Sequence, residues 1–258
     1  MESPYQYGGR SKMNQEGIVY VIGIGPGDLE HMTQAAKNAL EDAEIIVGYK
    51  TYISLIKDIV GEKKLMESPM KGEMDRCKKA LELAVKGERV AIVSSGDAGV
   101  YGMAGIIYEI AQKEAMNIKI EIIPGITAAS AAAAVLGAPL MHDFAIISLS
   151  DLLTDWKLIQ KRIELAAQGD FVLCLYNPKS KKRVKHIKIA REIILKFRSS
   201  KTPVGIVKNA KREKEEAFIT NLEEMLNYPI DMFTVVVIGN SNTKVLNGKM
   251  VTPRGYKL

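Results

Sequence analysis

Four short apolar runs in this 258-residue chain each end in a cluster of small residues. Run and cluster together span Ile18–Asp28, Val90–Gly99, Ile118–Ala129 and Phe171–Pro178. Short β-branched runs bounded by glycine and proline are typical of buried strands in a largely parallel sheet. In such sheets ligands bind outside the carboxyl ends of the strands, where small residues let the backbone approach them. We therefore expect the four clusters to bind a small organic molecule.

The first cluster limits the kind of ligand. A dinucleotide fingerprint requires glycine at position 28, which is Asp28 here, and Pro26 has no amide hydrogen for a phosphate nest. No GxxxxGK[ST] sequence occurs, which removes the P-loop interpretation. A nucleoside without phosphates fits better. The alternative is a plain strand-to-helix turn with Asp28 near the helix N-terminus.

Taken together, these motifs resemble those of the tetrapyrrole methylases, which use S-adenosyl-L-methionine (SAM). The resemblance runs from about Gly17 to Tyr256 and rests on separated motifs in the right order. They are Gly25–Asp28, Ser95–Asp97, Pro124–Ala128 and Met250–Tyr256. The resemblance implies two α/β domains with mainly parallel and mixed sheets, an active-site cleft between them, and a homodimer.

Three further segments, His142–Phe144, Ile147–Leu153 and Tyr176–Pro178, look like the branch that methylates C17 of precorrin-3B or cobalt-precorrin-3. That resemblance implies a role in cobalamin biosynthesis, with contraction of the macrocycle and a polycarboxylate tetrapyrrole as substrate. One departure is Asp155, where proline is expected before Trp156. The alternatives are a sister methylase acting on another ring carbon, a methylase of RNA or protein, and a non-catalytic nucleoside-binding regulatory module.

By the same resemblance, SAM and its product S-adenosyl-L-homocysteine are held between the domains, largely by backbone. The implied contacts are Pro26, Gly96, Asp97, Ala98, Tyr101, Thr127, Ala128, Asn177 and Ala210. Simpler interpretations stay open for three of these residues. Asp97 and Thr127 are also suited to capping the helices that follow them, and Tyr101 to an ordinary half-buried helix position.

Ring contraction moves protons, which requires groups that exchange them near neutral pH. His142 is the first candidate because its ordinary pKa lies near 6.5. We expect Asp143, Asp151 and Asp28 to donate, accept or orient protons, and Ser148, Lys208 and Arg254 to bind substrate. A hydrogen-bonded linker residue remains the alternative for His142, and surface charge the alternative for Lys208 and Arg254.

The net charge of +6 indicates an anionic partner. The densest basic segment, Lys179–Arg191, follows Asn177–Pro178 and is expected to form the first turns of a helix. It suits a solvated helix face or the carboxylates of a precorrin equally well. Nucleic acid is disfavoured because no aromatic residue occurs from Lys179 to Lys196.

The two cysteines and three histidines show no metal-binding spacing, so we expect neither a metal site nor a disulfide. Cys174 is expected to be a core residue. No apolar stretch is long enough to span a bilayer, and residues 1–16 lack the apolar core of a signal peptide. We therefore expect no membrane partner, a cytoplasmic location, and a disordered extension over residues 1–16.

Alternating apolar and amphipathic segments predict the two domains, over residues 17–137 and 143–258, with a linker at 138–142. Expected strands are 18–22, 44–47, 89–93, 118–123, 144–149, 171–176, 203–207, 217–220 and 234–238. Expected helices are 31–42, 50–59, 74–86, 101–114, 127–136, 156–167, 182–197 and 222–226.

Overall fold

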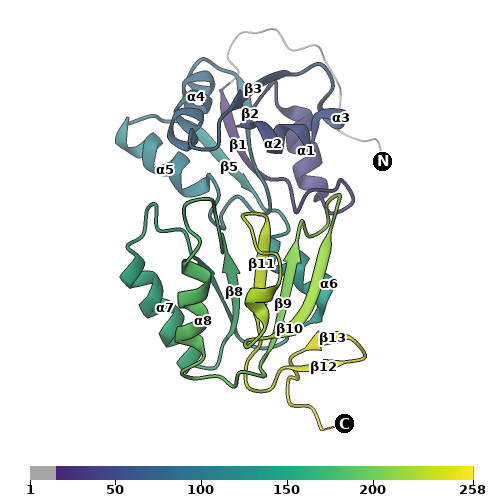
Figure 1. Ribbon diagram of the computed structural model, residues 1–258. Helices are drawn as coiled ribbons and strands as arrows, with labels where there is room; N and C mark the ends of the chain where they lie inside the picture. The colour runs from purple at the N-terminus through teal and green to yellow at the C-terminus, as the bar shows by residue number, and fades with distance from the viewer. Residues whose placement is uncertain (1–15, 258) are drawn as a thin grey trace. The chain divides into compact units, whose positions relative to one another are not determined.

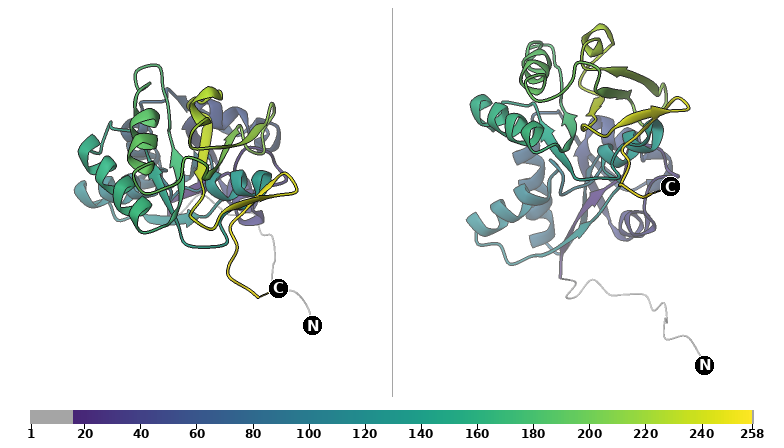
Figure 2. Two further views of the ribbon diagram at one scale, coloured as in Figure 1. Left: turned by 60° about the horizontal axis from the view of Figure 1, so that its bottom comes forward. Right: turned by 90° about the horizontal axis from the view of Figure 1, so that it is seen from below.

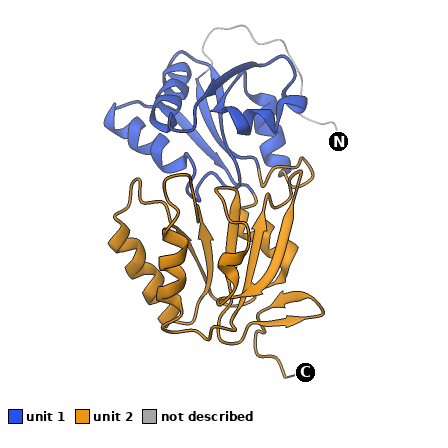
Figure 3. Ribbon diagram, viewed as in Figure 1, with its two compact units in different colours: residues 1–24, 33–125 blue, residues 25–32, 126–258 orange. Residues whose placement is uncertain are grey.

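A computed structural model describes residues 16–257, so the expected extension over residues 1–16 lies outside the described residues except for Glu16. The chain forms two compact units (Figure 3). The first contains the described residues up to Ile24 and Thr33–Gly125. The second contains Gly25–Met32 and the chain from Ile126 onward. Each unit has its own sheet and its own core.

The sheet of the first unit is fully parallel, with strand order β3-β2-β4-β1-β5 (Figure 1). Its strands are β1 (Ile18–Gly23), β2 (Ile45–Tyr49), β3 (Lys64–Ser68), β4 (Arg89–Ser94) and β5 (Lys119–Ile123). The central strands β1 and β4 are buried along most of their length, as their apolar runs predict. Parallel pairing places the carboxyl ends of all five strands at one edge.

Helices cover both faces of this sheet. They are α1 (Gln34–Asp42), α2 (Lys50–Ser54), α3 (Lys57–Val60), α4 (Glu73–Val85) and α5 (Ala104–Lys113). The apolar sides of α4 and α5 pack on Val19, Val21, Val90 and Ile92, which lie on one face. The opposite face is contacted by α1 and α2. The helices α1, α2, α4 and α5 therefore each bury apolar residues against the sheet.

The second unit has a mixed five-stranded sheet in the order β10-β9-β11-β8-β7. Its strands are β7 (Phe144–Ser148), β8 (Val172–Tyr176), β9 (Pro203–Lys208), β10 (Glu216–Asn221) and β11 (Thr234–Ile238). The β7–β8 pair is parallel, and β11 runs antiparallel to both β8 and β9. The carboxyl ends of β7, β8 and β9 therefore share one edge.

In this unit α7 (Trp156–Gln168) and α8 (His186–Ile194) lie side by side on one face (Figures 1 and 2). The other face packs against α6 (Ala128–Leu136), whose Ala129, Ala132 and Leu136 contact a layer that includes Cys174. The buried, free thiol of Cys174 confirms its expected place in the core. The remaining elements are a 3-10 turn (Met225–Asn227), β6 (Gly137–Ala138), β12 (Lys244–Leu246) and β13 (Lys249–Val251).

The predicted α/β class and the mixture of parallel and mixed sheets are confirmed. Several expected elements differ. The helix at 50–59 is broken into α2 and α3, and the polar link before α4 contains the edge strand β3. The helix expected at 222–226 is only the 3-10 turn, because Pro229 follows closely. The strands β12 and β13 were not predicted.

The basic segment is another difference, since Lys179–Lys185 precede α8 instead of forming its first turns. Ser180 and Arg183 close a turn there, in which each amide bonds to an oxygen of the other residue. The compact units also divide after Gly125 and not near Gly137, because α6 packs on the second sheet.

Candidate active site

The glycine-rich turns of the first unit meet through their backbones at the carboxyl edge of its sheet. A Cβ atom added to Gly23 would lie 2.7 Å from the Gly96 carbonyl oxygen and 2.8 Å from the Gly125 nitrogen. Gly96 itself has φ of 70°, a conformation that side chains disfavour. Close packing between the turns therefore requires these glycines, whether or not a ligand is bound.

Asp97 holds two of these turns together. Its Oδ2 accepts a hydrogen bond from the Gly125 amide at 3.0 Å, and its Oδ1 accepts one from the Gly99 amide at 2.8 Å. The next helix, α5, begins only at Ala104, so Asp97 does not cap it. The carboxylate fixes the turn conformation at the carboxyl ends of β4 and β5.

The neighbouring expected SAM contacts have different surroundings. Ala98 is fully buried in the cluster beneath α4 and α5, and its carbonyl accepts the Ala104 amide, so its side chain is part of the core. Tyr101 adopts φ of 56° and its side chain is exposed. It lies outside any helix, contrary to the half-buried helix position considered for it.

In the second unit, Ser148 and Asn177 meet at the carboxyl ends of β7 and β8. The Asn177 side-chain nitrogen donates to the Ser148 hydroxyl at 3.0 Å. Asn177 has φ of 51°, and Asn209, directly after β9, has φ of 52°. Strained non-glycine conformations of this kind cluster at functional sites.

Tyr176 connects this edge to the start of α6. Its hydroxyl oxygen lies 2.7 Å from Thr127 Oγ1 and accepts a hydrogen bond from the Ala129 amide at 2.6 Å. Thr127 occupies the N-cap position, but its side chain makes no capping hydrogen bond. The Tyr176 hydroxyl therefore caps α6, a role for which Thr127 was an alternative candidate. The same hydroxyl fixes the Thr127–Ala128 segment.

The Pro26–Asp28 turn packs within the second unit against the segment after β9. Asp28 donates its amide to the Lys211 carbonyl at 3.1 Å, and Arg212 donates to the Pro26 carbonyl. Asp28 Oδ1 also lies 2.6 Å from His31 Nδ1 and accepts the His31 amide at 2.9 Å. Pro26, Asp28 and the segment that follows Ala210 are thus brought together.

Two carboxylates, Asp231 and Asp151, make contacts with basic side chains at the same edge of the second sheet. Lys208 Nζ is 3.0 Å from Asp231 Oδ2, and this carboxylate raises the pKa of Lys208. Asp151, three residues beyond Ser148, places Oδ2 3.0 Å from His186 Nε2 and Oδ1 4.0 Å from Arg183 Nε. The contacts of Asp231 and Asp151 all join residues far apart in the sequence.

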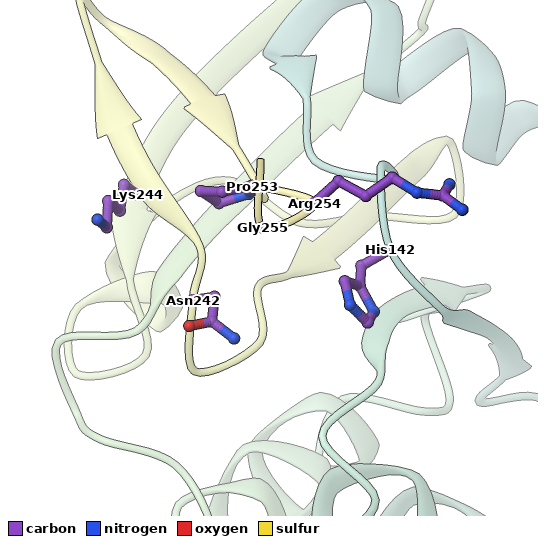
Figure 4. A pocket seen from close by; sticks show the side chains of 6 residues that line it. All are labelled: His142, Asn242, Lys244, Pro253, Arg254 and Gly255. Atoms are coloured by element: carbon purple, nitrogen blue, oxygen red, sulfur yellow. The ribbon is translucent and has the colours of Figure 1, made fainter. Parts of the chain in front are cut away.

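His142 and Asp143 lie at the amino end of β7, the opposite end of this strand from Ser148. His142 shares a surface pocket with Arg254, and Figure 4 shows Arg254 and Lys244 pointing away from each other. The pocket is lined by His142, Asn242, Lys244, Pro253, Arg254 and Gly255. The structure therefore does not bring His142, Asp143 or Arg254 together with Ser148, Asp151 and Asn177.

Sequence reasoning missed four residues that position this edge: Tyr176, Arg183, His186 and Arg212. Tyr176 was quoted only as part of a motif, and its contacts with α6 span 47 residues or more. For His186 the sequence shows only that it lacks metal-binding spacing and lies in the basic segment Lys179–Arg191. In residues 16–257 we find no cluster of side chains suited to a metal ion and no helix able to cross a membrane.

Comparison with known proteins agrees with this arrangement of motifs. Residues 18–226 match the family described as Tetrapyrrole (Corrin/Porphyrin) Methylases. The chain belongs to the tetrapyrrole methylases. The resemblance stated from the motifs alone is confirmed.

Two relatives of this tetrapyrrole methylase carry related names. A probable cobalt-factor III C(17)-methyltransferase from Salmonella typhimurium is 51% identical, over 93% of this chain and all of the relative. A cobalt-factor III methyltransferase from Priestia megaterium is 50% identical over 94% of this chain, which spans only 46% of that protein. A crystal structure of the methyltransferase CobJ superposes with a TM-score of 0.86 at 37% identity, covering 92% of this chain and 100% of that one.

Proposed function

We propose that this tetrapyrrole methylase transfers a methyl group from SAM to C17 of a cobalt-containing tetrapyrrole and assists ring contraction in cobalamin biosynthesis. The observation that carries the proposal is the 51% identity to the Salmonella relative along that protein's whole length. The names of this relative and of the Priestia protein favour a cobalt-containing substrate over a metal-free one.

The turns at the carboxyl edges suit SAM. When bound, SAM supplies an electrophilic methyl group on a sulfonium, so no nucleophilic side chain is required of the protein. Its uncharged adenosine suits backbone groups in small-residue turns, and Pro26 provides no amide for a phosphate. The proposed contacts are those expected from the motifs: Pro26, Gly96, Asp97, Ala98, Tyr101, Thr127, Ala128, Asn177 and Ala210.

The edge of the second sheet supplies groups for a polycarboxylate substrate. Ser148 and Asn177 are held together by their hydrogen bond, which leaves hydroxyl and amide groups fixed in orientation. Lys208, the last residue of β9, is partly exposed and contributes a positive charge at this edge. We assign Asp151 and Asp28 to proton transfer. We assign no step to His142 or Asp143, because these two residues lie at the amino end of β7, away from Ser148.

The experiment that tests the proposal uses purified protein, cobalt-factor III and SAM with an isotope-labelled methyl group. We expect one labelled methyl per macrocycle, located at C17 by NMR, and one equivalent of S-adenosyl-L-homocysteine. Label at another carbon would identify a sister methylase. SAM binding without turnover of any tetrapyrrole would favour the nucleoside-binding regulatory module.

We further propose a homodimer in the cytoplasm, as the family resemblance implies. Light scattering across a range of protein concentrations tests the dimer. A mass of one chain at every concentration would contradict it.

A further inference from the structure

Three short contacts fix the segment that follows β7. Leu149 donates its amide to the Tyr176 carbonyl at 2.9 Å, so the segment continues beside β8. The Ser150 hydroxyl accepts a hydrogen bond from the Arg183 guanidinium at 2.9 Å. The Asp151 carboxylate then meets His186 Nε2 at 3.0 Å. The next two residues, Leu152 and Leu153, are strongly exposed, so the fixed part of the segment ends at Asp151.

His186 is itself held in one orientation. It is the first residue of α8, and its imidazole ring lies 4.1 Å from the ring of Trp156, the first residue of α7. Asp155 caps α7 by accepting the amides of Lys157 and Leu158, which fixes where the indole stands. The side chain of His186 is only 16% exposed. The ring therefore has little freedom to turn away from Asp151.

The second nitrogen of the same ring has no obvious structural purpose. Nδ1 of His186 is buried and has no hydrogen-bond partner among residues 16–257. A buried polar atom without a partner is uncommon and costs stability. The cost is smallest when Nδ1 carries no proton, which leaves Nε2 as the protonated nitrogen that donates to Asp151.

We propose that His186 is a positioning residue that holds Asp151 as an oriented carboxylate, ready to accept a proton from the substrate during turnover. In that step a substrate X–H bond breaks, its electron pair stays on the substrate, and an O–H bond forms on Asp151. The proton then passes to solvent. This inference rests on the proposed function, which supplies the reaction that needs a base.

The electrostatics at Asp151 keep its carboxyl group ionised at neutral pH, which is the form that can accept a proton. Partial burial raises the pKa of Asp151, but the hydrogen bond from His186, a backbone hydrogen bond and, least of these, the positive charge of Arg183 outweigh it, so the net shift is downward. His186 from α8 and Arg183 from the preceding turn are the titratable groups placed against the carboxylate in the described part of the chain. Arg183 is buried and also donates a hydrogen bond to the Ser150 hydroxyl, so it helps to fix the segment that follows β7.

A matched pair of substitutions tests the role of His186. His186→Gln places an amide N–H where Nε2 lies, whereas the shorter His186→Asn does not reach Asp151. Glu192→Gln, at an exposed position of the same helix, serves as the control. For each protein we would measure the pKa of Asp151 by carboxyl NMR, SAM affinity, and kcat/KM against pH.

We expect His186→Asn to raise the pKa of Asp151 and to move the acidic limb of the kcat/KM profile upward by about one pH unit. On that limb, well below the ordinary carboxyl pKa near 4, its kcat/KM should fall roughly tenfold, while SAM affinity stays unchanged. His186→Gln and Glu192→Gln should both follow the wild type. If only thermal stability changes and the pH profile does not, the positioning role is wrong.

The two proposals fail in different ways. A wild-type protein that turns over no tetrapyrrole overturns the proposed function. An active wild type whose His186→Asn variant has a normal acidic limb overturns only the role of His186. If the variants do not fold, the NMR titration of the wild type still tests the role of His186. A pKa of Asp151 at or above its ordinary value would contradict the hydrogen bond between Asp151 and His186.

Discussion

Asp97 Oδ2 accepts the backbone amide of Gly125 at 3.0 Å and so ties the turn after β4 to the turn after β5. The other oxygen of the same carboxylate closes the turn on the Gly99 amide. Both bonds are charge-assisted, and the bond to Gly125 links two of the segments whose sequences predict a SAM site. If these turns bind SAM as proposed, we expect local stability and SAM binding to be coupled at this side chain.

Asp97→Ala removes both acceptors, and Asp97→Asn keeps one. We expect Asp97→Ala to lower the free energy of unfolding by about 2 kcal/mol and Asp97→Asn by about half of that. SAM affinity should fall at least about tenfold in Asp97→Ala because the turns lose their fixed geometry. Urea unfolding and calorimetry measure the two effects. Equal midpoints for all three proteins would show that these hydrogen bonds contribute nothing.

At Ala98 we expect a substitution to affect stability more than SAM affinity, because its side chain is fully buried in the core of the first unit. Ala98→Val adds two methyl groups to a packed site and should destabilise the protein by about 1–3 kcal/mol. The folded fraction should bind SAM almost normally, since the side chain of Ala98 points into the core. Thermal unfolding and SAM titration test this. Weakened SAM binding at an unchanged melting temperature would mean that the side chain of Ala98 contacts SAM and not the core.

Tyr176 and Thr127 offer a test of how the start of α6 is held. Tyr176→Phe leaves the Ala129 amide without its cap and should cost about 1 kcal/mol. Thr127→Val removes the other partner of the Tyr176 hydroxyl. In a double-mutant cycle on unfolding free energy we expect a coupling of about 0.5–1 kcal/mol. Strictly additive effects would mean that the 2.7 Å contact contributes no stability.

The sequence predicted the strands that are buried and apolar, because β1, β4 and β8 are regular runs bounded by glycine, serine or asparagine. It missed β3, a half-polar edge strand that lacks such a pattern. A usable signal for β12–β13 was overlooked. Asn247 and Gly248, with φ of 49° and 73°, form the Asn-Gly pair that is typical of tight hairpins.

The candidate site was predicted in part for the same reason. Residues that follow strands, such as Ser148 and Asn177, meet at the carboxyl edge, where small-molecule sites form in such sheets. His142 precedes β7, so the direction of the strand already places it at the other end. The Asp151–His186 and Thr127–Tyr176 contacts join residues 35 and 49 positions apart. No local pattern encodes such pairs.

The contacts of Asp231 lead to a prediction about the stability of the protein in acid. Its burial raises its pKa, but hydrogen bonds from Lys208, the Phe233 amide and Thr234 outweigh this and lower the pKa overall. A carboxyl whose pKa is lower in the folded protein stabilises it above the unfolded pKa, near 4. That stabilisation disappears as the pH falls through the folded value.

Asp231→Asn should therefore be less stable than the wild type at pH 7 and should lose less stability on acidification from about pH 5 to about pH 2. Glu62→Gln, at an exposed position, is the control and should follow the wild-type curve. Urea unfolding at a series of pH values gives the slopes directly. Parallel curves for Asp231→Asn and the wild type would mean that Asp231 titrates alike in the folded and unfolded chains, and that its contact with Lys208 is only a surface ion pair.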